Sequence, residues 1–119
     1  MTAAGSPFDR PGAEDLVTAV RDELAELVDR LSGRDRWLVR IATNALSIAG
    51  RELEFGPAMT IAHRDRLAEF GMADDVEMVD AIRSGAFDDR LAEVGTALWA
   101  TTLDKLRVAN PNYIDESGD

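Results

Sequence analysis

Apolar residues recur at helical spacing along almost the whole chain. Between Pro11 and Gly33 the pattern is clearest, at Leu16, Val17, Val20, Leu24, Leu27, Val28 and Leu31. A repeat of three and four residues predicts an amphipathic helix. Pro11 suits the first turn, acidic residues follow it, and Ser32-Gly33 ends the segment.

Glycine, proline and asparagine separate four further helical segments. The predicted helices cover residues 35–54, 57–70, 74–84 and 88–109. Pro57 disfavours helical geometry at Gly56, so the second helix should end there and Pro57 should open the third. Asp74 or Asp75 is expected to cap the fourth.

No segment alternates between apolar and polar residues at the period of a strand. The connections between the predicted helices are short, which favours antiparallel neighbours. We therefore predict an all-α, single-domain antiparallel helical bundle of four to five helices over residues 10–113. Residues 1–9 are expected to form a flexible tail and residues 114–119 an acidic tail.

The second predicted helix carries polar residues where a core face is expected. On a helical wheel Arg40, Asn44 and Arg51 form one stripe, and Glu52 falls inside the broad apolar arc. In the last helix Lys105 lies between apolar positions. The apolar face of that helix is predicted at Leu91, Val94, Leu98, Thr102 and Ala109.

Three interpretations of these charges are open. Glu52 and Lys105 could extend to the surface at the end of the bundle. They could instead form an internal pair, in a polar network with Arg40, Asn44 and Arg51. The third interpretation is a site open to a ligand or a partner protein.

The C-terminal segment offers a second candidate surface. Asn110 and Pro111 should stop the last helix, and Tyr113 is expected to follow in an extended stretch. Tyr113 could fold back on the bundle, or the segment could dock on another chain.

Composition excludes several classes of function. The net charge is −10, which opposes nucleic-acid binding. There is no cysteine and a single histidine, His63, which we expect at the surface. No metal set, cofactor motif or catalytic nucleophile is recognisable. No segment suggests a membrane span or a signal peptide, so a cytoplasmic location is expected.

Three stretches together resemble a known family: "RPGAEDLVTAVRDEL", "RIATNALSIAGRELEFGPA" and "KLRVANPNY". They are similar to small all-helical bacterial proteins classed as a domain of unknown function. Members resemble the small subunit of the 4-hydroxyacyl-CoA kinase of the levulinic-acid pathway. The motif positions of the family fall on Arg40, Asn44, Arg51, Glu52, Gly56, Pro57, Lys105, Asn110, Pro111 and Tyr113.

This resemblance implies a non-catalytic accessory subunit that supports an aminoglycoside-phosphotransferase-like kinase. An acyl-CoA-dehydrogenase-like protein would be a further partner. The alternative is a self-associating bundle, possible as a homodimer, that binds a small acidic ligand such as an acyl-CoA at Arg40, Arg51 and Lys105.

Overall fold

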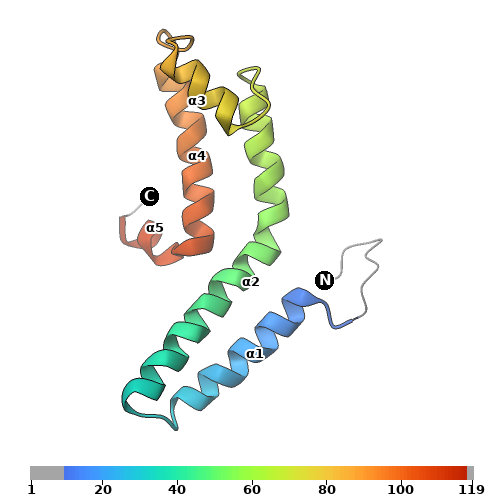
Figure 1. Ribbon diagram of the computed structural model, residues 1–119, viewed down its shortest axis with the longest axis vertical. Coiled ribbons are helices and arrows are strands. Elements are labelled where there is room, and N and C mark those ends of the chain that lie inside the picture. The colour runs from blue at the N-terminus through green and yellow to red at the C-terminus, as the bar shows by residue number, and fades with distance from the viewer. Residues whose placement is uncertain (1–9, 118–119) are drawn as a thin grey trace. The chain divides into compact units, whose positions relative to one another are not determined.

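The computed structural model describes residues 10–117, and all regular structure in that range is helical. The helices are α1 (Ala13–Val28), α2 (Gly33–Ala68), α3 (Asp75–Arg83), α4 (Leu91–Ala109) and α5 (Pro111–Ser117) (Figure 1). The all-α prediction is confirmed. No helix of the described range is long and apolar enough to cross a membrane.

The chain divides into two compact units, and the boundary lies between Glu54 and Phe55, inside α2. The first unit contains α1 and the first half of α2. The second contains the rest of α2 with α3, α4 and α5.

The first unit is a helical hairpin in which α1 runs antiparallel to α2 (Figure 1). Gly33 permits the tight connection because its φ is +60°, a conformation that other residues rarely adopt. At the turn, the guanidinium Nη1 of Arg36 donates to the carbonyl of Val28 at 3.0 Å. Gly50 of α2 faces α1, since a Cβ built there would lie 3.7 Å from Cγ1 of Val17.

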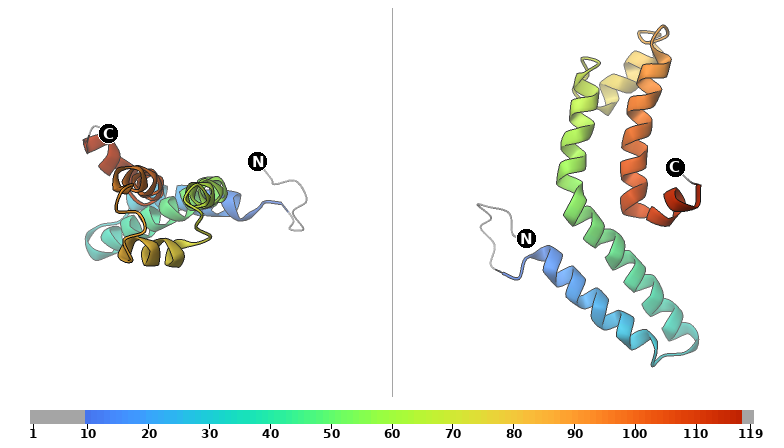
Figure 2. Two further views of the ribbon diagram at one scale, coloured as in Figure 1. Left: turned by 90° about the horizontal axis from the view of Figure 1, so that it is seen from above. Right: turned by 180° about the vertical axis from the view of Figure 1, so that it is seen from behind.

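The second unit contains the core cluster of the described residues. Leu67, Met78, Phe87 and Val94 are buried together, from α2, α3, the α3–α4 turn and α4. The ring of Phe70 packs edge-on against Phe87, with centroids 5.6 Å apart. Seen from above, α3 lies along one side of the α2 and α4 pair (Figure 2). Three helices thus enclose one small apolar core.

Local chemistry fixes both ends of α3. Of the two residues predicted to cap this helix, the structure shows Asp74, whose carboxylate accepts from the backbone N–H of Glu77 at 2.9 Å. The carboxylate of Glu77 accepts in turn from the N–H of Ala73 at 2.7 Å, one residue before the cap, so it satisfies a second backbone donor at this end of the helix. Gly85 follows the helix with a φ of +86°.

The predicted break at Gly56-Pro57 is wrong, because α2 continues through both residues to Ala68. Much of the clash that a proline imposes on the preceding residue involves the Cβ of that residue. Gly56 has no Cβ and accepts helical geometry there. The two predicted helices are therefore one helix of 36 residues.

The C-terminal prediction also differs from the structure. Tyr113 lies in the short helix α5, which starts at Pro111 and ends at Ser117. Proline suits the first turn of a helix, and the N–H of Tyr113 donates to the carbonyl of Asn110 at 3.1 Å. Ile114 is buried, so the predicted acidic tail begins inside an ordered helix. The predicted tail at residues 1–9 lies outside the described residues.

Candidate functional site

The polar stripe predicted on the second helix lies in the first half of α2. Arg40, Asn44 and Glu52 are exposed, and Arg51 is half-buried. Glu52 therefore does not occupy a core position of its own unit. Whether this stripe binds a partner stays a prediction.

The other predicted residues belong to the second unit. Lys105 is exposed on α4, Asn110 ends that helix, and the side chain of Tyr113 is 53% exposed on α5. Lys105 is thus no core residue either, and its pairing with Glu52 stays a prediction. Asn110 and Tyr113 lie within one turn of each other.

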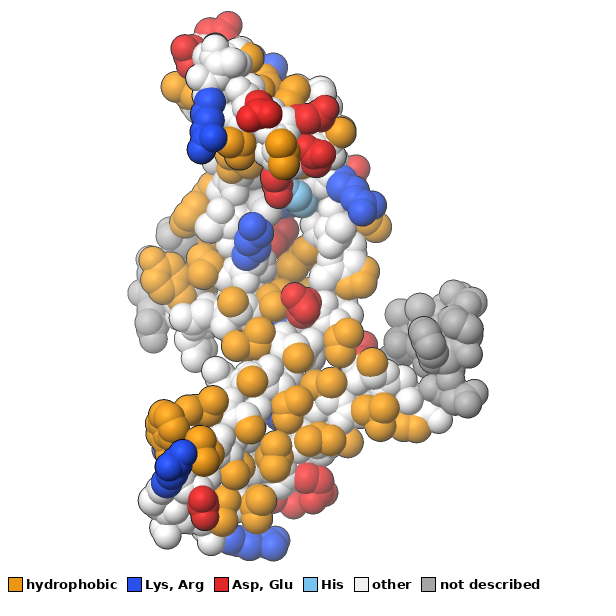
Figure 3. All heavy atoms as spheres, in the orientation of Figure 1, with side chains coloured by type: hydrophobic (Ala, Val, Ile, Leu, Met, Phe, Trp, Pro, Cys, Tyr) orange, Lys and Arg blue, Asp and Glu red, His pale blue; other side chains and the backbone are white. Residues whose placement is uncertain are grey.

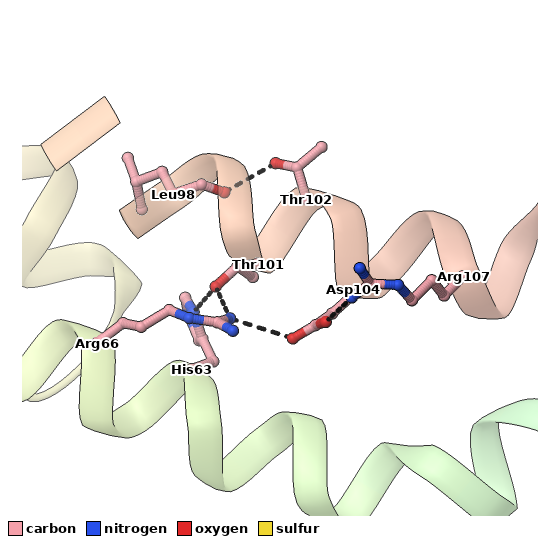
Figure 4. Close-up of polar contacts among 7 residues, drawn as sticks. All are labelled: His63, Arg66, Leu98, Thr101, Thr102, Asp104 and Arg107. Atoms are coloured by element: carbon pink, nitrogen blue, oxygen red, sulfur yellow. Dashed lines mark hydrogen bonds and ion pairs between the residues drawn. The ribbon is translucent and has the colours of Figure 1, made fainter. Parts of the chain in front are cut away.

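A polar cluster that was not predicted joins α2 to α4 in the second unit (Figure 4). The Nη1 of Arg66 donates to the hydroxyl of Thr101 at 2.9 Å and to the carboxylate of Asp104 at 3.2 Å. Arg107, one turn further along α4, donates to the same carboxylate at 2.8 Å. Asp104 is 14% exposed and is held by two guanidinium groups, as a largely buried carboxylate requires.

His63 extends this cluster to α3. Its Nδ1 lies 2.8 Å from the hydroxyl of Thr101, and its Nε2 lies 2.7 Å from a carboxylate oxygen of Asp75. The side chain of His63 is 23% exposed, so this histidine, expected at the surface, is half-buried and engaged by both ring nitrogens. It sits where α2, α3 and α4 meet.

The order hydroxyl, imidazole, carboxylate is also the order of an activated nucleophile. Here, however, Thr101 is 9% exposed and its hydroxyl already accepts a bond from Arg66. The hydroxyl is enclosed rather than open to a substrate. Within the described residues no buried side-chain nitrogen or oxygen lacks a partner. The geometry fits a structural role in which hydrogen bonds and ion pairs hold α4 against α2 and α3.

Sequence reasoning missed the cluster because the inward face of α4 is rotated from the predicted one. Val94, Leu98 and Thr101 follow the spacing of four and three residues, and Thr101 is buried. Leu91 and Thr102, both predicted on the apolar face, are exposed. The signal in the sequence that could have indicated a polar contact on this face was the pair of polar residues Thr101 and Asp104, one turn apart.

A second candidate site is the apolar surface of the hairpin. Among the described residues of the first unit, Val28 alone is buried. The exposed large apolar side chains of that unit are Leu16, Val20, Leu27, Trp37, Leu38, Ile41 and Leu53. Figure 3 shows hydrophobic side chains of α1 and of the first half of α2 gathered on one face. Exposed apolar patches of this kind are typical of surfaces that bind proteins, membranes or small ligands.

The comparisons with known proteins give one match. The model of a family described as a domain of unknown function (DUF6285) matches residues 29–113. The match begins after α1, so two of the three stretches that carry the resemblance lie inside it. No curated protein and no solved structure matches the chain.

Proposed function

Because the chain belongs to the DUF6285 family, whose function is unknown, we propose a role from its own residues: a non-catalytic, protein-binding subunit. The partner that the sequence resemblance implies is an aminoglycoside-phosphotransferase-like kinase acting on a hydroxyacyl-CoA. An acyl-CoA-dehydrogenase-like protein is a further partner in the same proposal.

The observation that supports the proposal is the apolar surface of the hairpin. Two helices bury only the stripe along which they touch, and the remaining apolar residues need another surface. In α1, Leu16, Val20 and Leu27 form such a stripe beside Val17 and Val28, which face α2. Leu16 is 53% exposed and Val20 is 50% exposed.

The polar cluster of the second unit supports the same role in a different way. The bonds of Arg66, Thr101 and Asp104 are made inside the unit, so the cluster stabilises the fold without a ligand. The cluster is therefore assigned to stability, and the surface proposed to bind a partner is the apolar one of the first unit.

Co-purification tests the proposal. We would express the tagged chain with the phosphotransferase-like kinase and measure ATP consumption that depends on 4-hydroxyacyl-CoA. The expected result is a stoichiometric complex that is active only when both chains are present. No complex, together with identical kinase kinetics with and without this chain, would overturn the proposal.

A matched pair of variants locates the surface. Leu16→Ser with Leu27→Ser removes two half-exposed leucines, and the loss should weaken the complex roughly tenfold or more. Asp22→Ser on the polar side of α1 is the control, and its complex should be unchanged. Equal behaviour of both variants would exclude this face of α1.

A further inference from the structure

We propose that α2 pairs with α2 of a second copy of this chain, as an antiparallel coiled coil. The pairing surface, which we call the α2 seam, consists of Arg34, Leu38, Ile41, Ala45, Ile48 and Glu52. These residues are spaced alternately by four and three positions. That alternation places them on the single stripe through which two helices interlock.

The α2 seam points away from α1. Gly50 faces α1, with its built Cβ 3.7 Å from Val17. Ile41 precedes Gly50 by nine residues, which is about two and a half turns, so its side chain leaves the opposite side of α2. Leu38 is 42% exposed and Ile41 is 47% exposed. Arg34, Ala45 and Glu52 are exposed as well, and Ile48 is half-buried, so the hairpin leaves most of the seam available to another molecule.

The seam is complementary to itself when it is reversed. A two-fold axis at the level of Thr43 brings Leu38 opposite Ile48 of the second copy. The same axis sets Ile41 against Ala45, a large residue against a small one. The seam positions are alternately of the a and d types of a coiled-coil heptad, and every pair across the axis joins an a position to a d position, as antiparallel coiled coils require. Because the axis is two-fold, the interface closes at two copies.

The ends of the seam specify its direction. Arg34 begins it and Glu52 ends it, 18 residues or about 27 Å apart. In the antiparallel arrangement each Arg34 faces Glu52 of the other copy. A parallel arrangement would set arginine against arginine and glutamate against glutamate, which is unfavourable. Within the described part of one copy, the side chains of Arg34 and Glu52 have no ion-pair or hydrogen-bond partner.

The distribution of charge favours association through the hairpin. Residues 1–54 hold seven arginines and ten acidic residues, whereas residues 55–119 hold six basic and thirteen acidic residues. Two copies thus meet through their less acidic units, where mutual repulsion is weaker. The exposed stripe of α1 stays available for the kinase of the proposed function, so the two interfaces are separate.

Charge reversal tests the pairing on the chain alone. The wild type should be a dimer by multi-angle light scattering and by sedimentation equilibrium. Arg34→Glu should place two repulsive contacts in the interface, as should Glu52→Arg, and each should raise the dimer Kd roughly tenfold or more. A mixture of the two variants restores both attractive contacts and should form a heterodimer with wild-type affinity.

Two controls make the same charge changes away from the seam. Arg40→Glu and Glu54→Arg alter exposed residues of the same helix, on other sides of it, and should leave the dimer Kd unchanged. Circular dichroism checks that every variant keeps its helices.

The possible outcomes are distinct. A wild type that stays monomeric up to high micromolar concentration overturns the pairing, as does a mixture that fails to associate. A monomer that still binds the kinase overturns this inference alone. A dimer that does not bind the kinase overturns the proposed function alone.

Discussion

The strongest test of the polar cluster is the substitution Thr101→Val. It keeps the shape of the side chain and removes the hydroxyl that lies 2.9 Å from Arg66 and 2.8 Å from His63. A hydrogen bond to a charged group contributes about 1.5–3 kcal/mol, and one between neutral groups about 0.5–1.5 kcal/mol.

The expected loss is smaller than the sum of these values. The side chains of Arg66 and His63 are 25% and 23% exposed, so water replaces part of each bond. Arg66 also keeps its contact with Asp104. We therefore expect the free energy of unfolding of the second unit to fall by about 2 kcal/mol.

Urea denaturation measures this loss if one tryptophan reports on one unit. Trp99 lies on α4, and Trp37 lies in the hairpin. A Trp37→Phe background therefore makes fluorescence specific to the second unit, and linear extrapolation gives its stability.

Thr102→Val is the matched control. The hydroxyl of Thr102 is exposed and donates only to the carbonyl of Leu98 in its own helix, at 3.0 Å (Figure 4). Its removal should change stability by less than about 0.5 kcal/mol. If Thr101→Val were equally harmless, or Thr102→Val equally harmful, the cluster would not hold α4 in place.

Two further substitutions test the local reasoning. Asp74→Ala removes the cap of α3 and should lower the free energy of unfolding by about 1 kcal/mol, measured by urea denaturation with Trp99 fluorescence. Asp74→Ser keeps a capping oxygen and should recover most of this loss. An unchanged denaturation midpoint for Asp74→Ala would contradict the capping role. Gly50→Ala should raise the stability of the hairpin by about 0.5–1 kcal/mol, because the new methyl meets Val17 at an ordinary contact distance and alanine favours helix. Fluorescence of Trp37 in a Trp99→Phe background measures this, and a loss of stability would mean that the helices pack more closely than the structure has them.

The helices could be predicted from the sequence because local patterns of residues determine them. The repeat of three and four residues, the cap at Asp74 and the glycines between helices, such as Gly33 and Gly85, are all short-range signals. Each acts within about one turn of the chain, so no knowledge of the rest of the molecule is needed.

The same local rules failed where two of them competed. Pro57 predicted a helix end, and the absence of a Cβ at Gly56 removed much of the clash that causes such an end. The rules also located Pro111 correctly as a helix stop but did not foresee that it would begin α5. Proline both ends one helix and suits the first turn of the next, and sequence alone does not say which follows.

What the sequence by itself determined is therefore an all-helical, acidic chain without cysteine and with polar residues on the outer faces of its helices. Only the tertiary structure decided which face of α4 is buried. It brought His63 and Arg66 within hydrogen-bond distance of Thr101, which lies more than thirty residues away in the chain. A helical pattern gives the direction of each side chain relative to its own axis. The rotation of one axis against another depends on packing among distant residues, and that packing assembled the cluster.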